Sequence, residues 1–325
     1  MQGVRITILW CIVLATIYAE EGPSTPRDDD PVIQKVRGLR NAGMKANDER
    51  MFKDAIEKLR HAISLLHNRV FGEERAAIKD PTVISQDAAL YAQILNDYGS
   101  VLIRTKQYDE AIEVLEDSVA MIEKIYGDSH PSLGLSLRSL ADAYMEKKAF
   151  KSAIKRYKTL RKHVKKGLGM THEAYIEASL KIAEGYKKLN KKDTSRKVLK
   201  DTLKAQGGEI NGLTIGIAEL YMELSSAHVE VGEIDDALRA AETASAIFLQ
   251  REGKDTMAYA FSLNALAGVK MQQKKVDEAI DLLDRAHNIA VSIYGENDRI
   301  TLASAKTLQD VKDHKMNLLA AKDEL

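Results

Sequence analysis

Tyr108-Asp109-Glu110-Ala111-Ile112 is the clearest copy of a pattern that returns along the chain at a fixed interval. Equal steps of forty-two positions from its alanine land on a small residue each time: Ala111, Ala153, Ser195, Ala237 and Ala279. A second column of small residues keeps the same interval: Gly99, Ala141, Ala183, Ser225 and Ala267. A third column holds residues that accept a left-handed backbone at a helix end: Gly127, Gly169, Asn211, Gly253 and Gly295. Three columns with one period predict a tandem structural repeat.

Each repeat contains two apolar stripes at helical spacing. Leu95, Tyr98 and Leu102 are three and four residues apart, which places them on one face of a first helix, and Ile112 and Leu115 begin the stripe of a second. The small residues let the two helices approach closely, but a single pair cannot cover its own apolar face. The sequence therefore predicts an all-α fold, an α-solenoid of about six helix-turn-helix repeats.

The ends of the array depart from the regular interval. An earlier repeat carries Phe52 and Ala55, and a 14-residue insertion around residues 73–87 separates it from the next one. This insertion predicts either a longer loop or a helix extension. A last apolar stripe over residues 301–319 predicts a C-terminal capping helix, which solenoids need. The predicted solenoid spans residues 32–320.

Four kinds of short motif extend this reading to a known family. They are Leu-Asn-x-Leu-Ala (263–267), Tyr-Asp-Glu-Ala-Ile (108–112), Ile-Tyr-Gly (125–127 and 293–295) and His130-Pro131. Together they resemble the tetratricopeptide repeat (TPR) family, in the longer form seen in kinesin light chains. The resemblance covers about residues 33–319. The chain departs from kinesin light chains because it has no N-terminal heptad coiled coil to dock a motor.

The resemblance implies that the first helix of each repeat lines a concave groove that binds peptides. The groove positions carried over to this chain are Asn96, Ser100, Arg104, Arg138, Asp142, Met145, Lys187, Lys188, Met222, Asn264 and Met271. We expect the two asparagines to hold a peptide backbone through both amide atoms. The three methionines would adapt to varied apolar side chains, and the basic members would suit an acidic ligand. The alternative is that these are ordinary solvated or packed helix positions.

Both ends of the chain predict an address in the secretory route. Residues 1–19 combine a weakly basic start, a twelve-residue apolar run and a small final residue, as in a cleaved signal peptide. A signal anchor is the alternative, although the run is shorter than the about 20 residues that span a bilayer. Lys322-Asp323-Glu324-Leu325 spells KDEL, the retrieval signal of the endoplasmic reticulum (ER). We therefore expect a protein of the ER lumen that meets the KDEL receptor, with residues 20–31 as a disordered spacer.

Cleavage after residue 19 would remove Cys11, the single cysteine of the chain, so the mature protein could not act as a disulfide isomerase. Formal net charge is zero, which implies no attraction of the whole chain to nucleic acid or to membranes, and a lumenal address excludes nucleic acid. Residues 147–204 are nevertheless rich in Lys and Arg. This basic run is interpreted as a solvated face, with docking of an acidic protein or of anionic lipid heads as the alternative. Membrane contact would be peripheral only.

The sequence contains no catalytic constellation that we can recognise. It has no His-Glu-x-x-His, no Gly-rich phosphate loop and no Gly-x-Ser-x-Gly elbow, and its eight histidines are scattered. Asp28-Asp29-Asp30 is interpreted as spacer, with a weak calcium site as the alternative. We therefore expect no catalytic residue, no metal and no cofactor.

The predicted function is a non-catalytic protein-interaction scaffold, or co-chaperone-like adaptor, of the ER lumen, whose partner is a lumenal protein or peptide. The alternative is a peptide-substrate-binding subunit of a multi-chain lumenal enzyme. A chain that is an enzyme in its own right is the third hypothesis, and the missing motifs argue against it.

Overall fold

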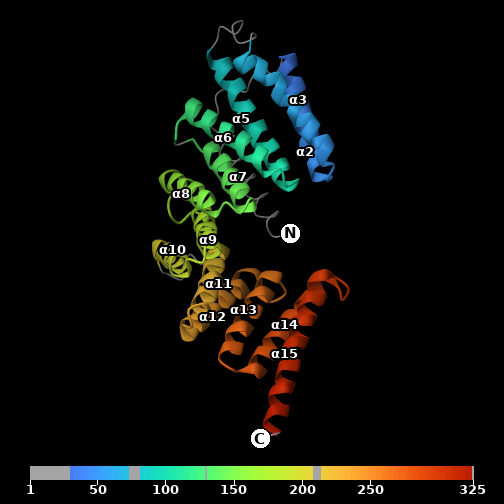
Figure 1. The fold of residues 1–325 in the computed structure, drawn as a ribbon, viewed down its shortest axis with the longest axis vertical. Helices are drawn as coiled ribbons and strands as arrows, with labels where there is room; N and C mark the ends of the chain where they lie inside the picture. Colours follow the sequence, from blue (N-terminus) through green and yellow to red (C-terminus); the bar gives the residue numbers. More distant parts are fainter. Residues whose placement is uncertain (1–29, 73–80, 129, 208–213, 324–325) are drawn as a thin grey trace. The chain divides into compact units, whose positions relative to one another are not determined.

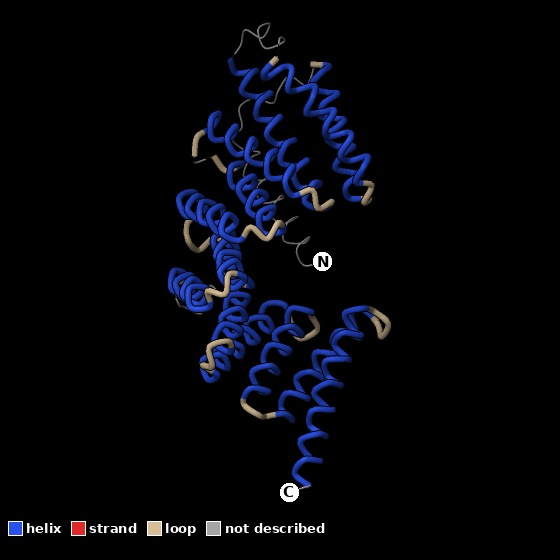
Figure 2. Tube along the Cα trace, in the orientation of Figure 1, coloured by secondary structure: helices blue, strands red, loops and turns tan. Residues whose placement is uncertain are grey.

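The computed structural model describes residues 30–72, 81–128, 130–207 and 214–323 (Figure 1). Thirteen helices and no strand occur in these ranges. In Figure 2 the described part of the tube is coloured as helix and loop only. The chain divides into two compact units, residues 1–167 and 168–325. The all-α repeat fold predicted from the sequence is confirmed.

Among its described residues, unit 1 contains three helical hairpins. Its helices are α2 (Pro31–Asp48), α3 (Phe52–Phe71), α5 (Pro81–Arg104), α6 (Tyr108–Tyr126), α7 (Ser132–Glu146) and α8 (Phe150–Gly167). The first helix of each hairpin packs on the second, and each second helix packs on the first helix that follows it. This is the stacking that a repeat with an uncovered apolar face requires.

The described part of unit 2 contains three more hairpins and a closing helix. Its helices are α9 (Glu173–Lys188), α10 (Lys192–Ala205), α11 (Ile215–Val229), α12 (Ile234–Glu252), α13 (Met257–Gln272), α14 (Val276–Tyr294) and α15 (Arg299–Asp323). One apolar cluster runs through them from Ile176 to Leu308. The prediction of about six repeats and a final helix is therefore confirmed.

The two columns of small residues lie where the helices of a hairpin meet. At Gly99 an added Cβ would stand 2.5 Å from the Cγ of Leu115, so only glycine fits there without displacing that leucine. Two hairpins of unit 2 use serine at a small position instead. Ser195 donates a hydrogen bond to the carbonyl of Ala183, and Ser225 donates to that of Ala237, both at 2.8 Å. A buried hydroxyl is tolerated because the facing backbone accepts its proton.

Two sets of turns repeat along the chain. The glycines of the predicted turn column end the second helices with positive φ, at 78° for Gly127 and 81° for Gly295, as the sequence indicates; Asn211 lies outside the described residues. Inside the hairpins, one left-handed residue closes each first helix: Arg50, Lys106, Lys148, Asn190, Gly232 and Lys274. In the second hairpin the N–H of Gln107 bonds to the carbonyl of Leu102 at 2.9 Å, which is a Schellman ending.

The start of unit 1 is fixed by a buried ion pair. Arg69 of α3 lies 2.9 Å from Asp87 of α5 and 3.0 Å from Asp30, whose carboxylate also caps the amides of Val32 and Ile33. Asp30, interpreted above as spacer, is therefore a structural residue, and α2 begins one residue before the predicted solenoid. The insertion is in part a helix extension, because α5 already begins at Pro81; residues 73–80 lie outside the described ranges.

The closing helix α15 packs on α14, with Leu308 buried and the hydroxyl of Thr301 donating to the carbonyl of Ala290 at 3.3 Å. Its last turn contains Lys322 and Asp323 of the predicted retrieval signal, whereas Glu324 and Leu325 lie outside the described residues. The predicted signal peptide, residues 1–19, also lies outside them. Among the helices that are described, none is long and apolar enough to cross a bilayer.

Candidate functional site

The first helices of the hairpins lie side by side within each unit, as α2, α5 and α7 and as α9, α11 and α13 (Figure 1). Residues from successive repeats therefore meet. In unit 2 the amine of Lys187 on α9 lies 2.8 Å from the carboxylate of Glu230 and donates to the hydroxyl of Ser226 at 3.1 Å, both beside α11. In unit 1 Arg40 of α2 lies 2.5 Å from Asp97 of α5. We call each of these surfaces the first-helix face of its unit.

Asn96 stands out on the first-helix face of unit 1. Its side chain was predicted to meet a ligand, yet only 6% of the residue is exposed. Its Oδ1 has no hydrogen-bond partner in the described part of the chain. Among the described residues, only two buried side-chain atoms lack one, and Asn96 Oδ1 is one of them. An enclosed acceptor without a donor costs about 1–3 kcal/mol. Asn96 is therefore a polar group that its own repeat does not satisfy.

Arg104, at the end of α5, is already engaged by the first hairpin. Its guanidinium donates to the side-chain oxygen of Asn47 at 2.7 Å and to the backbone carbonyl of the same residue at 3.2 Å. It also lies 5.0 Å from the ring centroid of Phe52, a cation–π distance. The residue is exposed, but its guanidinium already has hydrogen-bond acceptors in Asn47. Whether it also meets an acidic ligand stays a prediction.

The predicted residues of α7 are half-buried and tied to one another. Arg138 lies 3.9 Å from Asp142, one turn along the same helix, and the hydroxyl of Tyr157 on α8 donates to Asp142 as well. Met145 is half-buried one turn further on. On α5, Ser100 donates to a backbone carbonyl of its own helix, that of Asp97, at 2.9 Å. The polar groups predicted in unit 1 are thus largely satisfied within the unit.

The predicted residues of unit 2 are more open. Lys188 is exposed, and Asn264 is half-exposed in the middle of α13. Met222 and Met271 are half-buried and pack with one side against the apolar core. A thioether anchored in this way can change rotamer to follow a bound side chain. These side chains offer contact to a ligand rather than reactive chemistry.

An acidic group on the same face was not predicted from the sequence. Burial, together with the carboxylates of Glu173, Glu177, Glu223 and Glu252, raises the pKa of Glu219 to about 7. Glu177 and Glu219 are separated by one full repeat period, so both occupy the same position in successive repeats. The period could have revealed the pair, but their closeness to the other carboxylates depends on the packing of α9, α11 and α12.

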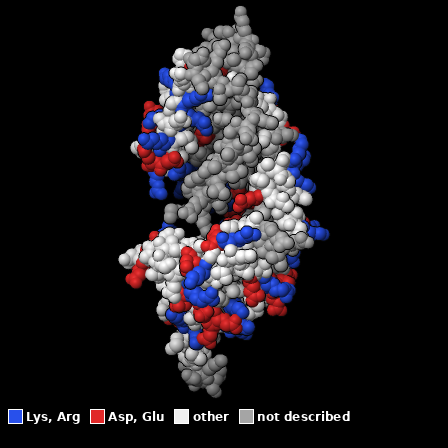
Figure 3. Space-filling view, turned by 180° about the vertical axis from the view of Figure 1, so that it is seen from behind, with Lys and Arg blue, Asp and Glu red and all other residues white. Residues whose placement is uncertain are grey.

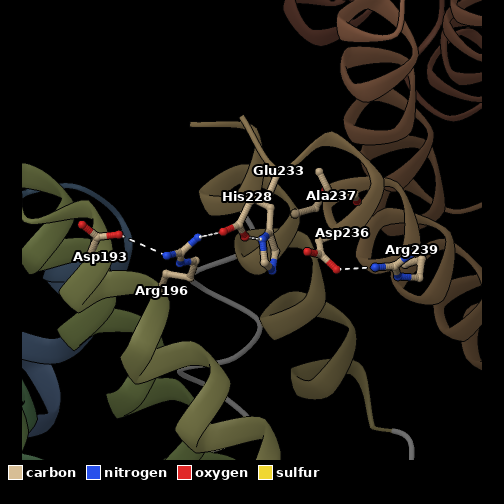
Figure 4. A network of polar contacts seen from close by, with 8 residues as sticks. Asp193, Arg196, His228, Glu233, Asp236, Ala237 and Arg239 are labelled. Carbon is tan, nitrogen blue, oxygen red and sulfur yellow. Dashed lines mark hydrogen bonds and ion pairs between the residues drawn. The ribbon is translucent and has the colours of Figure 1, made fainter. Parts of the chain in front are cut away.

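A second cluster joins the hairpin of α11 and α12 (Figure 4). His228, Glu233 and Asp236 bring one ligand atom each within 4.8 Å of one another, a grouping of the kind that can hold a metal ion. However, Arg196 lies 2.5 Å from Glu233 and Arg239 lies 2.5 Å from Asp236. The hydrogen bonds from these arginines lower the pKa of both carboxylates.

This cluster is therefore an ion-pair network. A cation placed among the three groups would stand close to two guanidinium groups that already neutralise the carboxylates. Asp235 and Asp236 lie in the first turn of α12, and the network involves Asp236. The sequence did not predict that His228, Glu233 and Asp236 come together, because the histidines are scattered along the chain.

Comparison with protein families supports the repeat fold. Models of the tetratricopeptide repeat match residues 90–166 and residues 262–299. Proteins of this fold act as protein-interaction scaffolds and are in general not catalytic.

Individual relatives agree with this. The chain is 72% identical over 339 aligned positions to the RxLR effector protein SFI4 of Phytophthora infestans, and the match covers 100% of both chains. It is 24% identical over 222 residues to the protein KINESIN LIGHT CHAIN-RELATED 2 of Arabidopsis thaliana, covering 66% of this chain and 32% of that one. Among solved structures, BtubC (BKLC) from P. vanneervenii superposes with a TM-score of 0.57 at 14% identity, covering 83% of this chain and 95% of the other. The kinesin-light-chain-like repeat predicted from the sequence is thus supported at the level of the fold.

Proposed function

The chain belongs to the family of the RxLR effector protein SFI4 of Phytophthora infestans, and from this premise we propose that it is an effector that works as a passive docking surface for a protein partner. The observation that carries the proposal is the first-helix face. It gathers polar and methionine side chains from successive repeats, as in the contact of Lys187 with Glu230. An extended segment of the partner would lie across these helices and touch one repeat after another.

The Arg-x-Leu-Arg pattern spelled in the relative's name occurs in this chain as Arg37-Gly38-Leu39-Arg40. The four residues lie within α2, and Arg40 is the residue that pairs with Asp97 of α5. In the folded protein this stretch is therefore part of the first hairpin.

The partner-binding residues are tested one unit at a time. A partner is first captured by proximity labelling around the intact chain, and its binding to purified protein is then measured by calorimetry. Asn264→Ala in unit 2 should weaken binding about tenfold, since a lost amide contact to a peptide backbone is worth about 1–1.5 kcal/mol. Asn96→Ala in unit 1 should weaken binding less, because only 6% of that residue is exposed.

The matched control is Asn288→Ala, on the exposed side of the second helix α14. It should bind like the unchanged protein. Equal affinity of all four proteins would remove the first-helix faces from the proposal.

We further propose that the protein acts in the ER lumen, entering by residues 1–19 and returning through recognition of Lys322-Asp323-Glu324-Leu325 by the KDEL receptor. The support is the two sequence signals alone. Lys192→Thr, which completes an Asn-x-Thr glycosylation acceptor at the exposed turn residue Asn190, reports on this address. The variant should gain a glycan that endoglycosidase removes, and deletion of residues 322–325 should send it into the medium. A variant that stays unglycosylated in cells would place the chain elsewhere.

A further inference from the structure

The outer side of α8 carries a charge pattern that the proposed function does not use. This 18-residue helix contains eight Lys or Arg residues and no Asp or Glu. Six of its lysines are exposed, and five of these follow one another at intervals of four and three residues, which places the five on one helix face. They are Lys151, Lys155, Lys158, Lys162 and Lys165. We call them the α8 lysine stripe; at 1.5 Å per residue it is about 21 Å long.

The direction of the stripe is fixed by the buried side of the same helix. Tyr157, Leu160 and Val164 are 2–3% exposed and hold α8 against the rest of unit 1. The stripe therefore cannot turn inward without opening the core. Because α8 is a second helix, the stripe also leaves the first-helix face clear for another partner.

The protein does not neutralise most of the stripe itself. In the described part of the chain no ion pair forms at Lys151, Lys155, Lys162 or Lys165. The carboxylates that do reach α8 pair with residues beside the stripe, as Glu116 does with Arg156 at 2.8 Å. Like charges one turn apart repel, so a row of this kind needs a counter-charge from outside.

The equivalent helix of the next repeat shows that such a row is not a property of the fold. On α10, lysines stand at 197, 200 and 204, each one repeat period after a member of the stripe. On α10, however, Asp193 and Asp201 occupy the positions of Lys151 and Thr159, so the net positive charge of this helix is lower than that of α8. On the face that Figure 3 shows, basic and acidic side chains are interspersed.

The composition of the stripe points to one kind of occupant. Protein interfaces are depleted in lysine at their centre and rich in aromatic residues, methionine and arginine, none of which the stripe contains. Sites for single-stranded nucleic acid add aromatic rings for stacking, and nucleic-acid-binding domains are basic as a whole, whereas the pI here is about 7.1. An anionic bilayer needs only point charges at its surface.

We propose that the α8 lysine stripe docks the protein on an anionic lipid surface. Each lysine that comes near such a surface strengthens binding about fivefold, and salt screens the attraction. The contact is peripheral, and it is independent of the partner bound on the first-helix face.

The test is co-sedimentation of the purified full chain with vesicles, made either of phosphatidylcholine alone or of phosphatidylcholine and phosphatidylserine in a two-to-one mixture. The buffer holds salt at about 100 mM, where surface charges still attract. We expect binding to the anionic vesicles only. The double change Lys155→Gln and Lys162→Gln should weaken it about 25-fold. The matched control, Lys197→Gln and Lys204→Gln, removes the same charge from the same repeat positions one repeat later and should change binding less than fivefold.

Circular dichroism checks that both double variants remain helical. Equal losses in the two variants would show attraction by overall charge and overturn the proposal. Failure of the unchanged chain to bind anionic vesicles would overturn it too, and retention instead by a DNA duplex or by polyglutamate would assign the stripe to another class of partner.

Discussion

The two units surround their buried carboxylates with different neighbours. In unit 1 burial raises the pKa of Asp87 and of Asp97, but each carboxylate lies within 3 Å of an arginine, Arg69 or Arg40, whose charge opposes that rise. In unit 2 Glu219 is surrounded by other carboxylates, and burial with this repulsion raises its pKa to about 7. The same repeat geometry can thus pair a buried carboxylate with an arginine, or leave it among other carboxylates with a pKa near neutral pH. The first choice rigidifies a hairpin contact, whereas the second makes one sensitive to pH.

Removal of the arginine at the start of unit 1 should have the largest effect. Arg69→Met leaves Asp87, whose side chain is 2% exposed, buried without its cation. A buried pair broken on one side costs about 3–5 kcal/mol. The free energy of unfolding of unit 1, measured by denaturant titration with hydrogen exchange to separate the units, should fall by that amount.

Two further proteins sharpen this result. Arg239→Met in unit 2 breaks an exposed pair, with 70% of the arginine side chain accessible, and should cost less than about 1 kcal/mol. The double change Arg69→Met with Asp87→Leu should recover much of the loss, because no lone charge stays buried. A small effect of Arg69→Met at pH 8 would contradict the view that pairing secures this end.

Substitution of Glu219 in unit 2 should give the next largest effect, and it should raise the free energy of unfolding instead of lowering it. Glu219 has a folded-state pKa of about 7 against a usual value of 4.5. The folded protein therefore holds a proton that the unfolded chain has lost between these values, and stability falls as pH rises from about 4.5 through 7. Glu219→Gln should stabilise unit 2 at pH 8 by at most about 3 kcal/mol and should change little at pH 4.5.

Melting temperatures at pH 4.5, 6 and 8 measure this difference. Glu223→Gln, an exposed neighbour on the same helix, is the control and should give a smaller gain that is also confined to high pH. Equal stabilisation at all three pH values would mean that Glu219 is not held near its point of protonation.

Asn96 provides a third comparison, between stability and binding. Asn96→Leu replaces an acceptor that lacks a partner in unit 1 with an apolar group of similar size. It should raise the free energy of unfolding by about 1 kcal/mol while it weakens partner binding. The half-exposed Asn264 of unit 2 offers the control, since Asn264→Leu should weaken binding without a gain in stability. Destabilisation by Asn96→Leu would show that the amide does serve its own repeat.

The sequence predicts those features that depend on spacing within the chain. The small columns at 99 and 111 locate both helices of a hairpin, because only small residues allow the approach seen between Gly99 and Leu115. The glycine turns follow from the same period. What spacing cannot predict is which charges become buried together. Asp30 and Arg69 are far apart in the sequence, and their contact depends on how α2, α3 and α5 stack.

The candidate site divides in the same way. Its positions on the first helices could be carried over by register, but their exposure could not, as the enclosed Asn96 and the engaged Arg104 illustrate. The Arg-x-Leu-Arg pattern at residues 37–40 was overlooked because it lies inside an ordinary helical stripe. The left-handed turn residues were missed since five of the six are not glycine.

Those turn residues give the smallest and most direct comparison of the units. Lys148 in unit 1 and Gly232 in unit 2 occupy the same turn position, with φ of 63° and 80°. No atom lies within 4 Å of the Cβ that a substitution would add at Gly232, so the cost of Gly232→Ala is that of the backbone alone, about 1 kcal/mol. Lys148→Gly relieves a similar strain but frees the unfolded chain, and the two effects should cancel to within about 0.5 kcal/mol. Hydrogen exchange in α11 and α12, and separately in α7 and α8, measures each change locally. The expectation would be contradicted if Lys148→Gly raised the free energy of unfolding by as much as Gly232→Ala lowers it. That result would show that glycine's greater freedom in the unfolded chain contributes little, so that the left-handed backbone at Lys148 costs its full strain energy.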